Sequence, residues 1–186
     1  RKESSAASDV YKRQVLERAI KTTYFLLERS NQLFIPVHKT WRLNERHYGG
    51  LQGLNKDAAR QEFGEEQVHI WRRSYDIAPP EATPEQRKAD LADRKYSDLD
   101  SRVVPTSESL KDTLARVIPY WDDAIAPELL KGKTVLVSAH GNSLRALIKH
   151  IEGVSDEDIV GYEIKTGSPL IYELDDNLNF VSKKYL

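Results

Sequence analysis

The sequence contains no cysteine and no methionine. Without cysteine there can be no disulfide, no thiol nucleophile and no cysteine-ligated metal site, which fits a reducing cytoplasm. A chain translated from its own start normally begins with Met, whereas this one begins with Arg1. We therefore expect it to be a piece of a longer protein.

Long apolar runs and a large net charge are missing as well. No stretch approaches the roughly 20 apolar residues of a membrane-spanning helix, and no charged start followed by an apolar segment indicates a secretory signal. The formal net charge is −1, so the chain as a whole has no electrostatic attraction for nucleic acid. We expect neither a membrane nor a nucleic acid as a partner, and any anion must be bound by locally clustered cations.

What is present describes one globular domain. The 186 residues are 39% hydrophobic and 31% charged, which allows a sizeable core. Apolar periodicity alternates between helical and strand-like segments, and this alternation predicts an α/β fold, a three-layer α/β/α sandwich with a mostly parallel sheet. Helices are expected over 15–30, 56–63, 66–73, 107–121, 142–151 and 155–158, and strands over 34–37, 134–139, 170–174 and 180–185.

Two stretches lack such periodicity. Residues 1–14 are polar and read as a leader, disordered or artefactual, outside a domain formed by residues 15–186. Residues 78–105 are rich in proline and charge, which predicts a long surface excursion and suggests a lid. Inside the helix expected from residue 107, Pro119 should produce a kink or an early end.

The organising stretch is Thr134–His150, in which a buried strand runs directly into an amphipathic helix. The turn between them lies at the carboxyl end of the strand, where ligands of open α/β sheets bind, and the helix N-terminus suits phosphate. Gly141 allows close backbone approach, Asn142 or Ser143 can cap the helix, and His140 stands at the mouth. Taken alone, an ordinary turn with an exposed histidine fits equally well.

A second candidate region is the loop 41–55, which is dense in charge, aromatic side chains and glycine. Glu45 in this cation-rich loop could exchange a proton with a substrate hydroxyl, or it could simply pair with a neighbouring arginine. Arg72-Arg73 could clamp an anion through paired guanidinium donors, or it could be a solvated helix end. Each reading stays open when the residues are taken one at a time.

Four segments in order remove much of this ambiguity: LNERHYGGLQGLNK (43–56), WRRSYD (71–76), PTSESLKDT (105–113) and VSAHGNSLRAL (137–147). Together they resemble the cofactor-dependent phosphoglycerate mutases of the histidine phosphatase superfamily. The resemblance runs from about Val15 to the carboxyl terminus. The first segment is specific to the mutase branch, while the His-Gly element is shared with the phosphatases.

The resemblance implies interconversion of 3-phosphoglycerate and 2-phosphoglycerate, primed by 2,3-bisphosphoglycerate and without a metal. It implies that His140 binds phosphate and stabilises the transition state, and that Glu45 is the acid/base. It also implies an assembly of two or more copies. The positions that match substrate-binding residues of the family are Arg18, Arg46, His47, Tyr48, Lys56, Arg72, Arg73, Gly141 and Asn142.

The chain departs from the family at its start. The phosphoryl group of the family is carried by a histidine in an Arg-His-Gly motif at the end of the first strand, and neither this motif nor that strand is recognisable here. We therefore expect a truncated mutase behind a foreign leader, with a sheet that lacks the neighbour of 134–139 and with no turnover of its own. The alternatives are a phosphatase of the same superfamily and a remnant that only binds phosphoglycerates.

Overall fold

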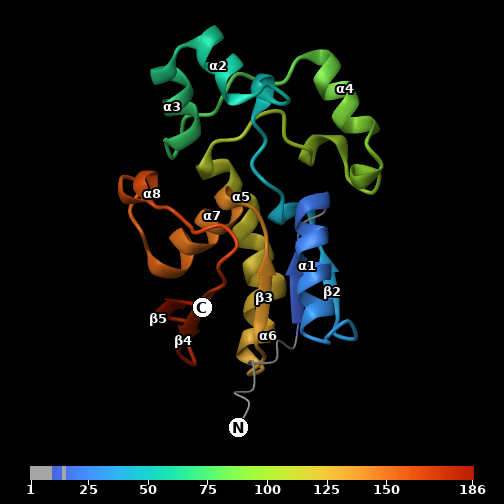
Figure 1. Cartoon of the computed structure of the whole chain (residues 1–186), viewed down its shortest axis with the longest axis vertical. Helices are drawn as coiled ribbons and strands as arrows, with labels where there is room; N and C mark the ends of the chain where they lie inside the picture. Colours follow the sequence, from blue (N-terminus) through green and yellow to red (C-terminus); the bar gives the residue numbers. More distant parts are fainter. Residues whose placement is uncertain (1–9, 14–15) are drawn as a thin grey trace.

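The computed structural model describes residues 10–13 and 16–186, with the side chains described from residue 16 onward. The sheet, α1 and α6 lie toward one end of the molecule, and α2, α3 and α4 lie at the other (Figure 1). The loop that contains Glu45 runs between these two ends.

The sheet of the described residues has three parallel strands in the order β2-β1-β3, namely Val37–Lys39, Val10–Arg13 and Val135–Ser138. The central strand corrects the expectation that residues 1–14 form only a leader and that the strand at 134–139 lacks its neighbour. Val10 and Tyr11 are residue types that favour strands. A strand between β2 and β3 also supplies hydrogen-bond partners for backbone groups of β2 and β3 that would otherwise be unpaired. The first strand after α1 also begins later than predicted, after Pro36.

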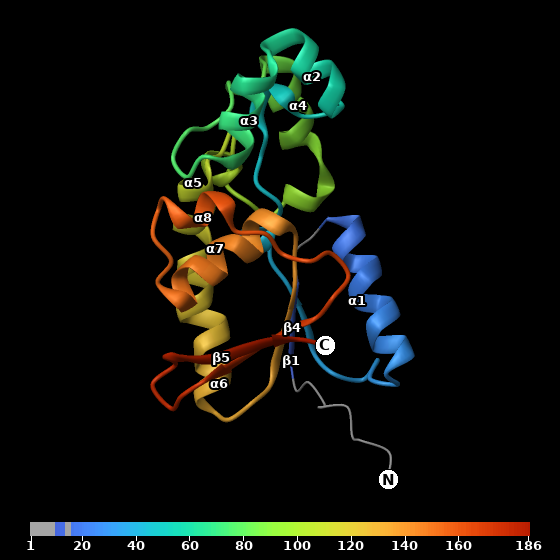
Figure 2. The same cartoon turned by 60° about the vertical axis from the view of Figure 1, so that its left-hand side comes forward.

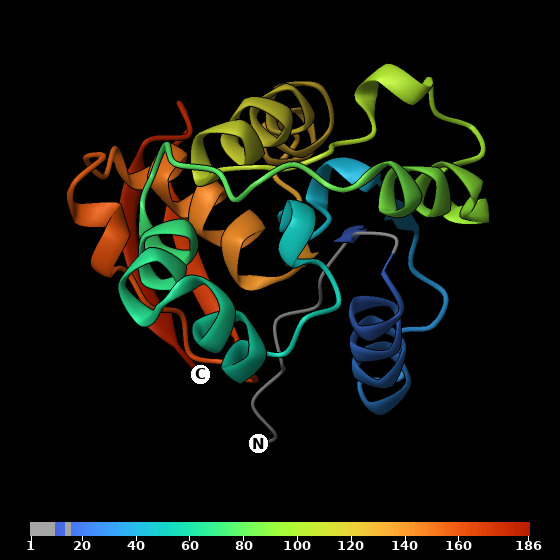
Figure 3. The same ribbon diagram turned by 90° about the horizontal axis from the view of Figure 1, so that it is seen from above.

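Helices cover both faces of this sheet. Helix α1 (Glu17–Arg29) lies on one side, and α5 (Leu110–Tyr120) with α6 (Ala126–Leu130) lies on the other (Figures 2 and 3). On α1, Ala19, Thr23 and Leu27 are buried while Phe25 is 61% exposed. These helices confirm an α/β fold.

The core lies mainly between α5 and α7 (Gly141–Glu152). Ser109 and Asp112 form a capping box that starts α5. Directly after Pro119 the helix continues as a π-helical turn, Trp121–Ile125, before α6 begins. Proline lacks the N–H that would donate a helical hydrogen bond, and its ring displaces the adjacent turn. The kink or early end predicted at Pro119 is therefore observed as a π-helical turn. The core residues that share this interface are Leu43, Leu110, Val117, Trp121, Ile125, Ala146, Leu147 and Ile159.

The far end carries α2 (Lys56–Phe63), α3 (Glu65–Arg73) and α4 (Pro84–Ala92), with short 3-10 turns at Trp41–Leu43, Gly49–Leu51, Arg94–Tyr96 and Ser101–Val103. The excursion 78–105 is bound to the loop before α2. The Gln86 side chain donates to the carbonyls of Gly50 and Gln52, at 3.4 and 3.3 Å. The excursion thus braces this loop, and the suggestion that it acts as a lid stays a prediction.

Gly49 is required at the contact between the loop and the excursion. Its φ is +55°, and a Cβ atom there would lie 2.0 Å from the carbonyl oxygen of Pro80. The neighbouring Gly50 N–H donates to the same oxygen at 2.8 Å. Only glycine combines this left-handed backbone with so close an approach.

The chain ends in α8 (Asp158–Gly161) and an antiparallel hairpin of β4 (Leu170–Leu174) and β5 (Phe180–Tyr185), as the sequence predicted. This hairpin is tied to the end of α7 through Glu152. Its carboxylate accepts hydrogen bonds from Lys183 at 2.7 Å, from Tyr162 at 3.1 Å and from Tyr172. Among the described residues, no helix is long and apolar enough to cross a membrane.

This cluster predicts a pH-dependent contribution to stability. Burial alone would raise the pKa of Glu152, but the hydrogen bonds from Lys183, Tyr172 and Tyr162 outweigh it and hold the pKa below its ordinary 4.5. A lowered carboxyl pKa stabilises the fold above the unfolded-state pKa, and this contribution is lost as the pH falls through the folded-state value. In thermal unfolding, Glu152→Gln should therefore lower the midpoint most near pH 7, with a shrinking difference below about pH 4.

Tyr162→Phe is the matched control, because it removes one donor and keeps the carboxylate. It should retain the pH dependence of the wild type with a smaller amplitude. An equal difference between wild type and Glu152→Gln at every pH would contradict this account.

Candidate active site

The candidate site begins where β3 passes into α7. His140 is the residue before the first helical turn, with an extended backbone, and its carbonyl accepts the N–H of Leu144 at 3.0 Å. The helix has no side-chain cap, so the predicted capping by Asn142 or Ser143 is wrong. Both side chains are engaged elsewhere, since Ser143 donates to the carbonyl of Asn44 at 2.5 Å and Asn142 donates to Tyr48.

Glu45 and Arg18 face His140 from two other parts of the chain. Burial lowers the pKa of His140 below its ordinary 6.5, the Glu45 carboxylate raises it, and the Arg18 guanidinium lowers it further. The Nε2 atom of His140 is buried and has no hydrogen-bond partner within the described part of the chain. The lowered pKa favours the neutral imidazole near pH 7.

A second group forms around the ring of Tyr48. The guanidinium carbons of Arg46 and Arg72 lie 4.8 and 5.2 Å from the ring centroid. The Tyr48 hydroxyl accepts a hydrogen bond from Nδ2 of Asn142 at 3.0 Å. Residues from the loop, from α3 and from α7 thus meet at one aromatic side chain, as the motifs predicted.

Arg46 is the most buried cation of this group. It is 2% exposed, and its Nη2 donates to the carbonyl of Trp71 at 2.8 Å. Its Nε and Nη1 atoms are buried without a partner in residues 10–13 or 16–186. Buried guanidinium donors are normally satisfied, so two open donors and a positive charge fit a bound anion.

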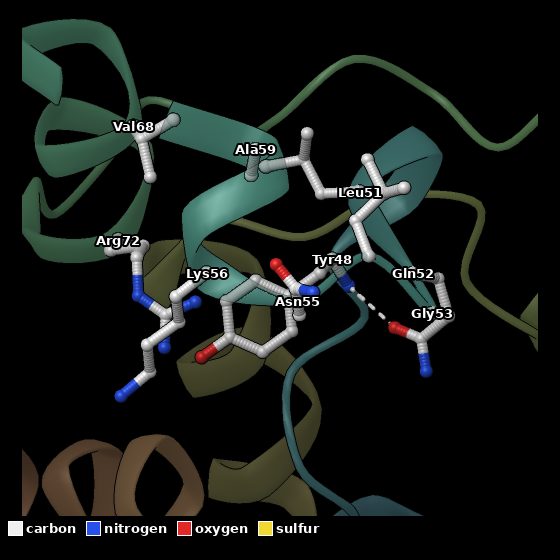
Figure 4. A pocket seen from close by; sticks show the side chains of 10 residues that line it. Tyr48, Leu51, Gln52, Gly53, Asn55, Lys56, Ala59, Val68 and Arg72 are labelled. Atoms are coloured by element: carbon white, nitrogen blue, oxygen red, sulfur yellow. Dashed lines mark hydrogen bonds between the residues drawn. The ribbon is translucent and has the colours of Figure 1, made fainter. Parts of the chain in front are cut away.

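A cavity of about 320 Å³ opens beside Tyr48. Figure 4 shows the ends of Lys56, Arg72 and Tyr48 pointing toward the same side of this cavity. The other lining residues are Leu51, Gln52, Gly53, Leu54, Asn55, Ala59 and Val68. A Cβ atom added at Gly141 would meet no atom of the described residues within 4 Å, so on their side the start of α7 is also open to close approach.

Two predicted ligand contacts are arranged differently from the rest. Arg73 pairs with Glu163 at 2.9 Å, so only Arg72 of the expected arginine clamp lies on Tyr48. His47 bonds to Glu108 through both its N–H and its carbonyl, at 2.8 and 2.9 Å. Its ring lies between the Gly49 N–H and Asp90, at 3.0 and 2.9 Å. His47 therefore holds the loop, and its contact with a ligand stays a prediction.

Beneath the loop lies an ion pair that the sequence analysis did not identify. Arg116 donates to both carboxylate oxygens of Glu108, at 2.6 and 3.0 Å, and both residues are buried. The same guanidinium donates to the carbonyls of Arg42, Asn44 and Glu45, at 2.6, 2.9 and 3.4 Å. One feature of the sequence could have identified this pair: Arg116 directly precedes Val117, which lies on the inward face of α5.

The arrangement gathers cations and open hydrogen-bond donors at one place on an α/β fold. A model of the histidine phosphatase superfamily (branch 1) matches residues 15–96 and 81–184. A mycobacterial glucosyl-3-phosphoglycerate phosphatase solved with VO3 aligns over 95% of this chain and 74% of its own, with a TM-score of 0.64 and 19% identity. At this identity the likeness concerns the fold alone. The family model, which matches most of the chain, shows that the chain belongs to the histidine phosphatase superfamily.

Much more similar relatives narrow the assignment. A 2,3-bisphosphoglycerate-dependent phosphoglycerate mutase of Staphylococcus carnosus (strain TM300) is 84% identical over 100% of this chain, which spans 81% of that relative. The mutase of the same name from Staphylococcus aureus (strain JH9) is 66% identical over the same shares. The chain belongs to the 2,3-bisphosphoglycerate-dependent phosphoglycerate mutase family.

The buried ion pair predicts a large stability effect. Glu108→Ala leaves the Arg116 guanidinium buried without its carboxylate and frees the N–H of His47. Breaking a buried pair in this way costs about 3–5 kcal/mol of unfolding free energy. Urea unfolding followed by circular dichroism measures the loss.

Asp57→Asn provides the comparison, because Asp57 pairs with Arg60 at 3.5 Å with its side chain 85% exposed. An exposed pair contributes roughly 0–1 kcal/mol. Equal losses in the two variants would mean that the buried pair does not hold the loop.

Proposed function

We propose that this site binds phosphoglycerates and serves the interconversion of 3-phosphoglycerate and 2-phosphoglycerate, a step of glycolysis and gluconeogenesis. The observation that carries the proposal is the 84% identity, over 185 residues, to a mutase of that specificity. The cations gathered around Tyr48 support it, since the substrate carries a phosphate and a carboxylate.

We assign the anionic ends of the substrate to the group around Tyr48. Arg46 and Arg72 offer planar forks suited to paired oxygens, and the open donors of Arg46 point to such a partner. Tyr48 and Asn142 add neutral donors, and Lys56 adds a flexible charge at the mouth of the cavity. Gly141 leaves room for a phosphate at the N-terminus of α7.

We assign the transferring phosphoryl group to the side of His140 and Arg18. Phosphoryl transfer needs positioning and compensation of negative charge spread over the transferring oxygens. Both side chains are cationic or become so, and Glu45 lies near enough to influence the pKa of His140. Glu45 is then placed to accept a proton from an attacking hydroxyl and to return it to a leaving one.

The family name implies dependence on 2,3-bisphosphoglycerate, and the described residues fit such a ligand. Its two phosphates and one carboxylate match the two cationic groups, around Tyr48 and around His140. When bound, it supplies the priming phosphoryl group. The absence of a metal, a cytoplasmic location, the three-layer sandwich and assembly into a dimer or larger oligomer remain predictions.

No Arg-His-Gly motif occurs in the 186 residues. We therefore expect these residues by themselves to bind phosphoglycerates without turning them over, and ligand binding is the appropriate test. The phosphatase alternative is less favoured, because the likeness to the mycobacterial phosphatase, at 19% identity, concerns only the fold. The loop around Glu45 and the Arg72-Arg73 pair also favour a small phosphorylated acid over a variety of phosphate esters.

Binding of 3-phosphoglycerate should be accompanied by proton uptake. His140 is neutral when free, because burial lowers its pKa, and a bound phosphate raises that pKa by favouring the imidazolium. The affinity should therefore increase as the pH falls from about 8 to about 6. Calorimetric titrations in two buffers of different ionisation enthalpy measure the uptake.

His140→Asn should bind more weakly and should remove most of the proton uptake. Arg72→Ala should abolish the binding signal. If wild type showed no binding, the proposed function would fail for these residues. If binding occurred with no proton uptake, the role of His140 would be wrong.

Gly141→Ala tests the approach of a phosphate to the start of α7. The added methyl meets no atom within 4 Å among the residues that the structure describes, so the thermal midpoint should not fall. The methyl would occupy the space in which a phosphate meets the backbone donors, and the affinity for 3-phosphoglycerate should drop about tenfold or more. Unchanged affinity would place the phosphate elsewhere.

A further inference from the structure

Arg145 is a buried cation for which the motifs predict no role. It lies on α7, three residues after Asn142, and is 6% exposed. Its Nη1 donates to Oδ1 of Asn142 at 3.1 Å, and its Nη2 donates to the carbonyls of Ile159 and Val160. Within the described residues it forms no ion pair with a carboxylate, and its Nε has no partner.

The surroundings of Arg145 are predominantly cationic. Burial lowers its pKa, the charges of Arg73 and Arg46 lower it further, and Tyr48 and Glu45 raise it. A guanidinium nevertheless remains protonated at neutral pH. A buried charge without a counter-ion is costly for folding. The presence of such a charge beside the candidate ligand site suggests that Arg145 has a function there.

The hydrogen bonds of Arg145 determine which way the Asn142 amide faces. A guanidinium has donors only, so the atom of Asn142 that faces it must be the oxygen. The amide nitrogen then faces Tyr48, where it donates to the hydroxyl at 3.0 Å. Because the Tyr48 hydroxyl accepts from Asn142, its own hydrogen is left to point at another acceptor.

We propose that Arg145 is a positioning residue of this site: it orients the Asn142 side-chain amide so that the Tyr48 hydroxyl is held as a hydrogen-bond donor toward the anionic ligand. The identity of the ligand rests on the proposed function, while the orientation of the amide does not. Without Arg145 the amide is free to rotate. The Tyr48 hydroxyl can then donate its hydrogen bond to the amide oxygen of Asn142 and not to the ligand.

A merely structural role would consist of the bonds from Arg145 to the carbonyls of Ile159 and Val160, which join α7 to α8. Loss of these bonds would lower stability whatever residue stands at position 48. The positioning role instead makes the effect of Arg145 depend on the Tyr48 hydroxyl. A double-mutant cycle between the two residues separates these roles.

The first measurement needs no ligand. In ¹⁵N-labelled protein, the side-chain amide signals of Asn142 are identified by their disappearance in Asn142→Ala. Tyr48→Phe should shift these signals in wild type and should leave them almost unmoved when Arg145 is replaced by Met. Equal shifts in both backgrounds would overturn the proposal.

The second measurement is the affinity for 3-phosphoglycerate. Arg145→Met should weaken binding about three- to tenfold, the range expected for one hydrogen bond, and less than about twofold in the Tyr48→Phe background. The same loss in both backgrounds would overturn the proposal. Absence of binding in wild type would count against the proposed function, and the amide signals would still decide the role of Arg145.

Arg145→Lys covers the case in which Arg145→Met does not fold. Lysine keeps the charge but lacks the planar fork that reaches both Asn142 and the carbonyls beyond it. It should fold and should show the same loss of coupling to Tyr48, in the amide signals and in affinity. Full restoration of affinity and coupling by lysine would show that the charge alone acts, which contradicts orientation by the fork.

Discussion

The buried pair of Glu108 and Arg116 is the interaction on which the site depends. A carboxylate and a guanidinium can be buried together only when every remaining donor and acceptor finds a partner. Here those partners are backbone groups of residues 42–47. They form hydrogen bonds of 2.6 to 3.4 Å with the two side chains of the pair. The loop therefore gains a fixed course without belonging to a helix or a strand. Glu45 and Arg46 project from that fixed backbone, and Tyr48 follows directly after it.

The positive charge of the protein is concentrated where it is needed for an anion. The chain as a whole carries a formal charge of −1, yet Arg46 and Arg145 are buried close to Arg72, Arg73 and the N-terminus of α7. Desolvated cations this close together repel one another, and their burial is tolerable when an anion of matching shape shares the space. On the proposed function, the charge of a phosphoglycerate and the open donors of Arg46 would satisfy this condition together. The substrate would then be part of the electrostatic balance of the site.

Where the structure departs from the sequence-based expectations, the reason is pairing between distant segments. Residues 10–13 have no periodicity of their own that predicts a strand, but β2 and β3 offer backbone partners on both sides. The excursion 78–105 has no regular pattern because prolines interrupt it, and only the structure shows that Gln86 and Asp90 tie it to the loop. For His47 the motif predicts a ligand contact, which stays a prediction, while the structure adds that its polar groups hold the motif in place.

The sequence by itself determined the strand-to-helix unit at 134–152, the pair of helices at 56–73, the terminal hairpin and the family, because local periodicity and ordered motifs carry that information. It also named the residues that meet at the site, since Glu45, Tyr48, Arg72, His140 and Asn142 all belong to those motifs. Only the tertiary structure decided which polar side chains hold the others. Glu108 with Arg116, and Arg145 with Asn142, act through buried hydrogen bonds whose value depends on a partner's position and on the exclusion of water. Neither condition can be read from the identity of one residue or from its spacing to the next.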